Sequence, residues 1–289
     1  MIHCRPLLPK EHLYESKSHQ CVIDTTPFLR RILRKIYVAH ATLELGTETR
    51  FATFQIFHRC LSHYIYHNIK CTKENLTENG DNNALSTKQK QELSSLAVAS
   101  IFLGCKLCNE HRRLRDVINI KHVLQMEDDL EVGVNEVNEH KPPPSLDEEY
   151  WKQKEEMVRI EQTLLRIIDF DVNVSFPHRI MILTWEEIIK RLEERKAGIM
   201  DEKSLKYWRC ILHNSWKRLN SILFNVDCMV FSCSSLACAA LSLAIEDTKA
   251  QVPDSMSICD KIDVEWWVWL DVTSDELSKV KDKVSKAAM

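Results

Sequence analysis

Two similar stretches decide the fold: SSLAVASIFLGCK at residues 94–106 and SSLACAALSLAIE at residues 234–246. Six of their thirteen aligned positions are identical. Both are long enough for a helix and consist mainly of small and apolar residues, a composition typical of a helix buried on all sides. They differ at the last position, which is Lys106 in one and Glu246 in the other. We infer an internal repeat in which each copy is built around a buried helix.

The sequence around each stretch predicts four more helices, from apolar residues at helical spacing and from N-cap signals. In the first copy we expect five helices. The first opens at Thr26-Pro27, the second runs from about 50 to 67, and the third follows the capping box 86–89. The fourth lies around 114–124, and the fifth runs from the capping box 145–148 to about 168. In the second copy we expect helices at about 177–196, 205–224, 229–246 and 266–270, and a last one opened by the capping box 273–276. Two five-helix units, each with its small-residue helix third, predict an all-α fold.

The domain organisation follows from these elements. We predict an N-terminal extension at 1–25, a first repeat at 26–174 and a second repeat at 175–289. Polar residues at 73–87, and acidic residues followed by three prolines at 126–145, predict two loops in the first repeat.

Composition bears on several function classes. The formal net charge of −3 argues against a nucleic-acid-binding protein. The basic clusters Arg30-Arg31/Arg34-Lys35 and Arg112-Arg113/Arg115 are local, and a solvated helix surface explains them. Eleven cysteines without an apparent export signal predict reduced thiols in the nucleus or cytoplasm. Residues 228–245 lack charges, but several serines interrupt them, so we expect a buried helix and no membrane span.

The chain shows no motif of an enzyme. It contains no GxGxxG, GxxxxGK[ST], HExxH or GxSxG pattern. Cys105, Cys108 and His111 have spacing seen in metal sites, but Cys105 is expected inside the buried helix and no second CxxC is present. His63 and His67 could share a helix face without an accompanying carboxylate. We therefore expect no catalytic residues, no cofactor and no metal.

Glu161 interrupts an apolar helix face formed by Met157, Leu164 and Ile168. A buried and unpaired carboxylate would cost several kcal/mol. Glu161 must therefore be exposed at an edge, be paired within the chain, or be held for a partner. Lys106, at the end of the first buried helix, is explained equally well by the helix dipole or by a partner contact.

The arrangement resembles the cyclin family. The similarity lies in SSLAVASIFLGCKLCNEHRRLRDVINI (94–120), in MVRIEQTLLRIIDFDVNVSFPH (157–178) and in the tryptophan-containing EWWVWLDVTSDEL (265–277). It covers roughly residues 25–286 and implies two tandem cyclin boxes. The residues are most similar to the transcription-type subfamilies, cyclin Q first, with cyclins K, T, L and C as alternatives.

The resemblance implies a regulatory subunit that binds and allosterically activates a cyclin-dependent kinase as a heterodimer. The kinase would be cyclin-dependent kinase 10 if the chain is cyclin Q-like. The implied kinase-binding residues are Lys106, Glu161, Leu107 and Phe170; taken alone, Leu107 and Phe170 are typical of core positions. The matching cyclin residues of the first box contact the kinase αC helix. RRILRKIY (30–37) lacks the tryptophan of the cell-cycle docking patch, so no substrate-docking site is predicted. There are two alternative functions: a nucleic-acid-binding protein similar to transcription factor IIB, and a scaffold without a kinase.

Overall fold

The computed structural model describes residues 27–64, 87–120, 148–194, 202–251, 262 and 265–287. Across these residues every regular element is an α-helix or a 3₁₀ helix. The predicted N-terminal extension and the predicted loop 126–145 lie outside the described residues. The same holds for the predicted loop 73–87 except Thr87, which is the first residue of a helix.

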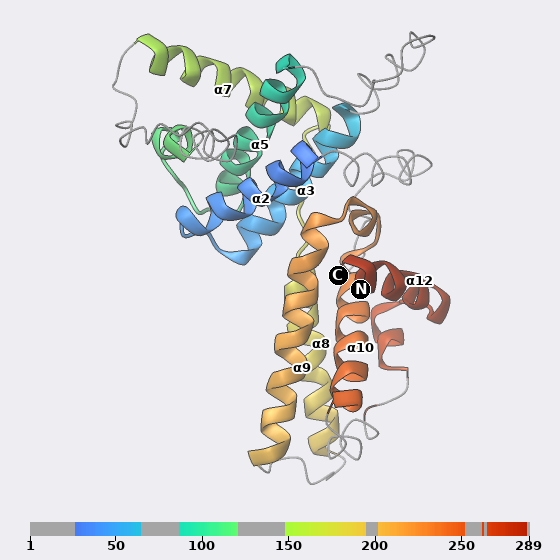
Figure 1. Ribbon diagram of the computed structural model, residues 1–289. Helices are drawn as coiled ribbons and strands as arrows, with labels where there is room; N and C mark the ends of the chain where they lie inside the picture. Colours follow the sequence, from blue (N-terminus) through green and yellow to red (C-terminus); the bar gives the residue numbers. More distant parts are fainter. Residues whose placement is uncertain are drawn as a thin grey trace, which may run out of the picture. The chain divides into compact units, whose positions relative to one another are not determined.

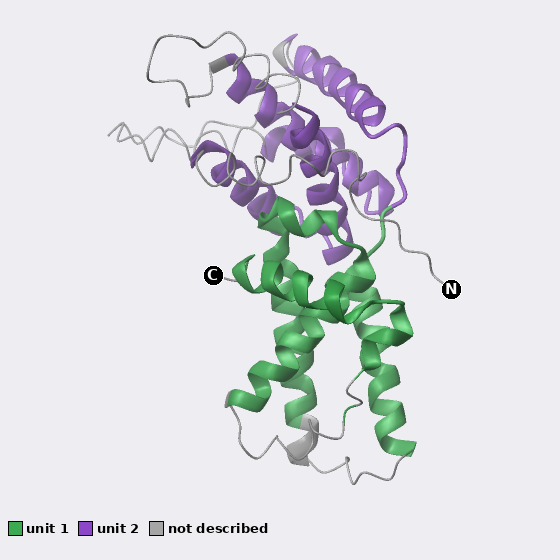
Figure 2. Cartoon of the chain, turned by 90° about the vertical axis from the view of Figure 1, so that its right-hand side faces the viewer, with its two compact units in different colours: residues 1–20, 174–289 green, residues 21–173 purple. Residues whose placement is uncertain are grey.

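The chain divides into two compact units, one within residues 21–173 and the other within residues 174–289 (Figure 2). The first unit contains α2 (Pro27–Thr42), α3 (Thr47–Tyr64), α5 (Thr87–Leu107), a helical stretch at 114–120, and α7 (Glu148–Ile167) (Figure 1). Helix α5 packs against α2, α3 and α7, so the predicted buried helix lies at the centre of this unit.

The second unit repeats this arrangement. It contains α8 (Pro177–Glu194), α9 (Glu202–Ser221), α10 (Cys233–Gln251), the 3₁₀ helix η6 (Trp266–Leu270) and α12 (Ser274–Ala287). Helix α10 packs against α8, α9, α12 and η6 (Figure 1). Apart from two further 3₁₀ helices in the second unit, the described elements therefore form two bundles of five helices built around α5 and α10, as the internal repeat predicts.

Helix boundaries differ from the prediction most clearly before α10. The predicted helix start at Met229 is wrong, because residues Val226–Val230 form a separate 3₁₀ helix, η4. The side chain of Asn225 caps η4 by accepting a hydrogen bond from the backbone N–H of Asp227 at 2.9 Å. Helix α9 likewise ends at Ser221, and the 3₁₀ helix η3 (Ile222–Phe224) follows it. At η4 the polar cap formed by Asn225 overrides the run of apolar residues, whereas η3 has no side-chain cap.

Small residues allow close helix packing at α5. A Cβ added to Gly104 would lie 2.3 Å from the Oγ1 atom of Thr53 on α3 and 3.3 Å from its backbone nitrogen. The corresponding position of α10 is Ala244, which is fully buried. Glycine in a helix interior is unfavourable by about 1 kcal/mol relative to alanine. At Gly104 the short distance between α3 and α5 explains why it is nevertheless present.

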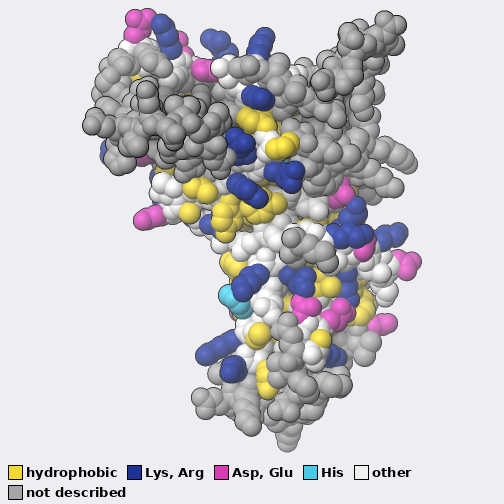
Figure 3. Space-filling view, in the orientation of Figure 1, with side chains coloured by type: hydrophobic (Ala, Val, Ile, Leu, Met, Phe, Trp, Pro, Cys, Tyr) yellow, Lys and Arg dark blue, Asp and Glu magenta, His cyan; other side chains and the backbone are white. Residues whose placement is uncertain are grey.

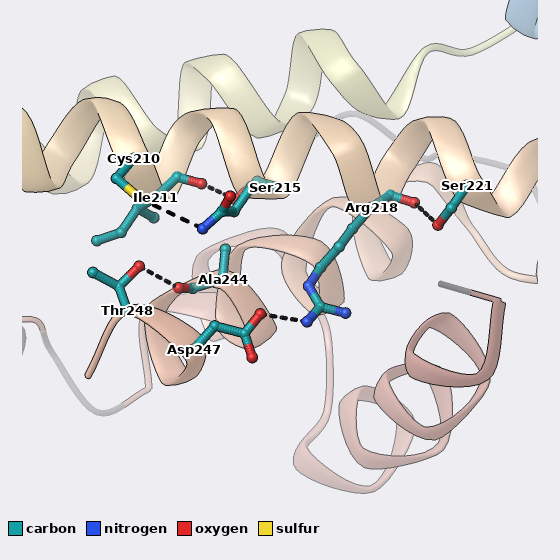
Figure 4. Close-up of polar contacts among 9 residues, drawn as sticks. Cys210, Ile211, Ser215, Arg218, Ser221, Ala244, Asp247 and Thr248 are labelled. Atoms are coloured by element: carbon teal, nitrogen blue, oxygen red, sulfur yellow. Dashed lines mark hydrogen bonds and ion pairs between the residues drawn. The ribbon is translucent and has the colours of Figure 1, made fainter. Parts of the chain in front are cut away.

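Buried hydroxyl groups within the bundles bond to their own helices. Ser100, Thr184, Ser215 and Thr248 each donate a hydrogen bond of 2.8 Å to the carbonyl oxygen four residues earlier. Figure 4 shows this arrangement for Ser215 on α9 and Thr248 on α10. Because the hydroxyls are satisfied locally, serine and threonine are tolerated in helices that are otherwise apolar.

Candidate functional site

The first unit presents an ion pair between its third and fifth helices. Lys106 lies in the last turn of α5 and Glu161 lies on α7. The Nζ atom of Lys106 donates a hydrogen bond to the Oε1 atom of Glu161 at 2.6 Å. The lysine side chain is 43% exposed, whereas the glutamate side chain is only 11% exposed. The pair therefore joins a buried carboxylate to a cation that faces solvent.

Glu161 occupies the environment that its sequence context predicts. Met157, Leu164 and Ile168 on the same helix are all buried. Of the three alternatives for this carboxylate, the structure shows pairing within the chain, and exposure at an edge is wrong. A carboxylate in such a position is stable because the lysine neutralises it.

Lys106 is held over an aromatic ring as well as beside a carboxylate. Its Nζ atom lies 4.2 Å from the ring centroid of Phe102, one turn earlier on α5. A cation at this distance from an aromatic face is attracted to it. Leu107, the last residue of α5, is half-buried and follows Lys106 directly. The lysine thus has apolar neighbours on its own helix and a carboxylate on the next.

The end of α5 is fixed by a Schellman motif, which keeps Lys106 in place. The backbone N–H of Glu110 bonds to the carbonyl of Cys105 at 3.0 Å, and Asn109 adopts a left-handed φ of 57°. The Glu110 carboxylate then accepts a hydrogen bond from the backbone N–H of Gly46 at 2.8 Å. These bonds satisfy the last carbonyl groups of the helix and attach its end to the α2–α3 turn.

Arg112 strengthens the same attachment. Its guanidinium donates two hydrogen bonds to the carbonyl oxygen of Leu43, at 2.9 and 3.1 Å. Arg113 and Arg115 of the same cluster are exposed, as a solvated helix surface predicts. The expectation that this whole cluster is solvated is therefore wrong for Arg112, which has a structural role.

Phe170 lies just beyond the end of α7, in an unusual conformation. Helix α7 ends in a second Schellman motif, in which the N–H of Phe170 bonds to the carbonyl of Leu165 at 2.8 Å. Asp169 and Phe170 both adopt left-handed φ angles, of 52° and 54°. The Phe170 side chain is 64% exposed, so the sequence-based expectation of a core position is wrong. A bulky residue at positive φ is rare, and the cost of this conformation is often linked to function.

The segment that carries Phe170 is tied to α3. The Arg59 side chain donates a hydrogen bond to the carbonyl oxygen of Asp171 at 3.2 Å. Burial lowers the pKa of Arg59, and the neighbouring charge of Asp171 opposes this shift. The aromatic side chain is thus presented from a fixed backbone.

Sequence reasoning identified Lys106 and Glu161 separately, without predicting that they bond to each other, and it missed two exposed apolar residues nearby in the sequence. The structure brings Lys106 and Glu161 together and places Phe170 nine residues after Glu161, at the end of the same helix. Val158, three residues before Glu161, and Val172, two residues after Phe170, are exposed apolar side chains that the sequence analysis did not identify. The sequence could have identified these two valines from their short spacing from Glu161 and Phe170.

Comparison with known proteins gives a consistent result. No protein-family model matches the chain. The chain is 24% identical to human cyclin-L2 over 196 residues, which covers 68% of this chain and 32% of the relative. It is 25% identical to cyclin-L1 of Gallus gallus over 198 residues, which covers 68% of this chain and 31% of that protein. The chain thus spans about a third of the length of the curated relatives it matches.

A solved structure agrees with the sequence relatives. The chain matches a chain of the crystal structure of the yeast RNA Pol II CTD kinase CTDK-1 complex with a TM-score of 0.58 and 13% sequence identity. The match covers 98% of this chain and 73% of that one. The comparisons support the cyclin family. The fold is that of two tandem five-helix cyclin boxes. The relatives reported are cyclins L, so the cyclin Q subfamily stays a prediction.

The second cyclin box carries a counterpart of the ion pair with its charges reversed. Glu246 occupies the position of Lys106, and it accepts a hydrogen bond from Lys281 on α12. The neighbours also differ, because Ser242 and Asp247 replace Phe102 and Leu107. Asp247 is in turn bound by Arg218 of α9 (Figure 4). The apolar surroundings of the first pair are therefore absent at these positions of the second cyclin box.

The residues that the structure describes form neither a metal-binding cluster nor a helix suited to span a membrane. Within the described ranges no three His, Cys, Asp or Glu residues lie close enough to hold a metal ion. Cys105 is buried, and burial raises the pKa of its thiol to about 11, so it is protonated at neutral pH. No helix in the described part of this cyclin-fold chain has the length and apolar character needed to cross a bilayer.

Proposed function

We propose that this chain is the regulatory subunit of a cyclin-dependent kinase and performs no chemistry itself. The Lys106–Glu161 pair carries the proposal, because it sets a half-exposed cation and a nearly buried carboxylate beside apolar residues in the first cyclin box. The cyclin-L relatives and the fold match to a chain of a CTD kinase complex support it. We propose further that the kinase acts on substrates that take part in transcription.

The proposed binding surface consists of Lys106, Leu107, Glu161 and Phe170, with Val158 and Val172 beside them. Lys106 would donate hydrogen bonds to acceptor groups of the kinase while keeping its bond to Glu161. Phe170, fixed at the end of α7, would insert into an apolar recess as an aromatic anchor. Such surfaces place a few strong contacts among weaker apolar ones that exclude water.

Activation would be allosteric. By binding the kinase αC helix, the cyclin would favour the conformation in which the kinase's β3 lysine pairs with its αC glutamate. The fixed ends of α5 and α7 suit this role, since a rigid surface holds its partner in one conformation at a low entropic cost.

Finer assignments extend the same proposal. A cyclin Q-like chain would pair with cyclin-dependent kinase 10, whereas a cyclin L-like chain would pair with a different kinase. Nuclear or cytoplasmic localisation, a heterodimer with one kinase and the lack of direct nucleic-acid binding also remain predictions. Affinity capture of the full chain from its own cells, followed by identification of the bound kinase, decides between cyclin-dependent kinase 10 and a different kinase.

The double variant Lys106→Ala/Glu161→Ala tests the binding surface. Removing both partners avoids leaving Glu161 as a buried unpaired charge. We expect kinase binding to weaken by about 2–5 kcal/mol, while unfolding stays cooperative. The matched control is Glu246→Ala/Lys281→Ala, which removes the corresponding pair of the second cyclin box and should leave capture unchanged. Normal kinase capture by Lys106→Ala/Glu161→Ala would rule out this surface.

A further inference from the structure

Helix α2 has a basic outer face that the proposed kinase surface does not use. The helix contains Arg30, Arg31, Arg34 and Lys35 and no acidic residue. Its opposite face is buried through Leu29, Ile32, Leu33 and Ile36. Arg30 and Arg34 are exposed and lie one helical turn apart. Arg31 and Lys35 are half-buried and already have interaction partners, so we base the inference on Arg30 and Arg34.

Cations on the two neighbouring helices border the same face. On one side, the Nζ atom of Lys90 on α5 lies 5.8 Å from the ring centroid of Phe28. On the other side, the guanidinium of Arg50 on α3 lies 4.6 Å from the ring centroid of Tyr37. In Figure 3, Lys and Arg side chains gather over the region of α2, with hydrophobic side chains beside them. The positive charge thus extends over parts of three helices.

The chemistry of this face suits a phosphate group on a peptide. Arginine guanidinium groups bind phosphate through paired, charge-assisted hydrogen bonds, and clusters of arginines recognise phosphorylated segments. Val38, one turn after Arg34, is 43% exposed and offers an apolar contact next to the charges. We propose that the outer face of α2 binds a phosphorylated segment of a protein, with Arg30 and Arg34 holding the phosphate.

The size of the face favours a peptide over a nucleic acid. From Arg30 to Val38 the helix extends only about 12 Å along its axis. Proteins that bind a duplex strongly neutralise roughly six to ten phosphates over a longer surface. The formal net charge of −3 also opposes general attraction to nucleic acid.

The test uses the purified full chain without a kinase, so its result is independent of the proposed function. Fluorescence anisotropy would measure binding of a labelled degenerate peptide library with one fixed phosphoserine, and of the same library with serine. We expect binding of the phosphorylated library alone, and at least about tenfold weaker binding by Arg30→Ala/Arg34→Ala. The control Arg113→Ala/Arg115→Ala removes two exposed arginines elsewhere in the unit and should bind normally.

Several results would overturn the proposal. In the first two, the parent chain fails to bind the phosphorylated library or binds both libraries with equal affinity. In the third, the two double variants lose the same amount of affinity for the phosphorylated library. The same anisotropy experiment is also carried out with a labelled RNA or DNA duplex. If a duplex binds more tightly than the phosphopeptides at 0.15 M salt and depends on Arg30 and Arg34, this face is a nucleic-acid site instead. Circular dichroism melting of each variant checks that folding is retained.

Discussion

Glu246 on α10 is bound by Lys281 on α12, and this pair reverses the polarity of Lys106 and Glu161 between the corresponding helices of the first cyclin box. In each cyclin box an ion pair therefore joins the third and fifth helices. The bridge itself is common to both units, whereas the sign of the charge on the third helix distinguishes them. An acceptor group on a partner can bond to a lysine at that position and is repelled by a glutamate.

Reversing the first pair separates bridging from binding. In Lys106→Glu/Glu161→Lys the two helices remain bridged, so we expect the free energy of unfolding to fall by less than about 2 kcal/mol. Part of that loss comes from a negative charge at the C-terminal end of α5. Kinase capture should nevertheless be lost. Urea unfolding and capture from cell extract measure the two effects. Capture equal to that of the parent would show that polarity is unimportant.

Phe170 is expected to contribute to binding and little to stability. Its side chain is mostly exposed, so Phe170→Ala should change the free energy of unfolding by less than about 0.5 kcal/mol. Loss of an aromatic anchor should weaken kinase binding by about 1–4 kcal/mol. Val268→Ala, an exposed apolar residue of the second unit, is the control. If both variants bind the kinase as the parent does, Phe170 is not an anchor.

Gly104→Ala should destabilise the chain, although alanine is the better helix former. The added Cβ would meet Thr53 of α3, and overpacking of this kind costs about 1–3 kcal/mol. Thr53→Ala removes the nearest atom, Oγ1, so the double variant should recover part of the loss. Thermal unfolding of the two single variants and the double variant measures this coupling. A more stable Gly104→Ala chain would show that α3 and α5 have room to separate.

His40 should make stability depend on pH. This residue is fully buried in α2, and burial together with the charge of Arg50 lowers its pKa from 6.5 to about 3. Between these values the unfolded chain binds a proton that the folded chain does not bind. The protonation of His40 therefore leaves the free energy of unfolding unchanged above about pH 6.5. As the pH falls from 6.5 toward 3, it lowers the free energy of unfolding by up to about 1.4 kcal/mol per pH unit.

The variant His40→Leu isolates this effect. Urea unfolding at pH 7.5 and at pH 5.5 gives the loss of stability for each chain, and the loss should be smaller in the variant. The other histidines contribute equally to both chains, so the difference reports His40 alone. Equal losses in the two chains would mean that His40 is protonated in the folded protein.

The sequence alone determined the helical class, the repeat and the burial of α5 and α10. These follow from local patterns: small apolar residues, helical spacing and capping residues, as in Thr273, whose Oγ1 accepts a hydrogen bond from the N–H of Glu276 at 3.3 Å. Glu276 departs from the capping box, because its carboxylate accepts a hydrogen bond from Ser235 on α10. A local motif thus predicted the helix start, and a tertiary contact redirected one of its side chains.

Only the tertiary structure decided how the site is built. Lys106 and Glu161 are 55 positions apart, and their pairing depends on how α5 packs against α7, which no local pattern specifies. The exposure of Phe170 likewise depends on the left-handed turn that ends α7, formed without glycine in a chain that has only five. Local free energies select helices, whereas the partners of a charge and the outward direction of an aromatic ring are set by the packing of distant segments.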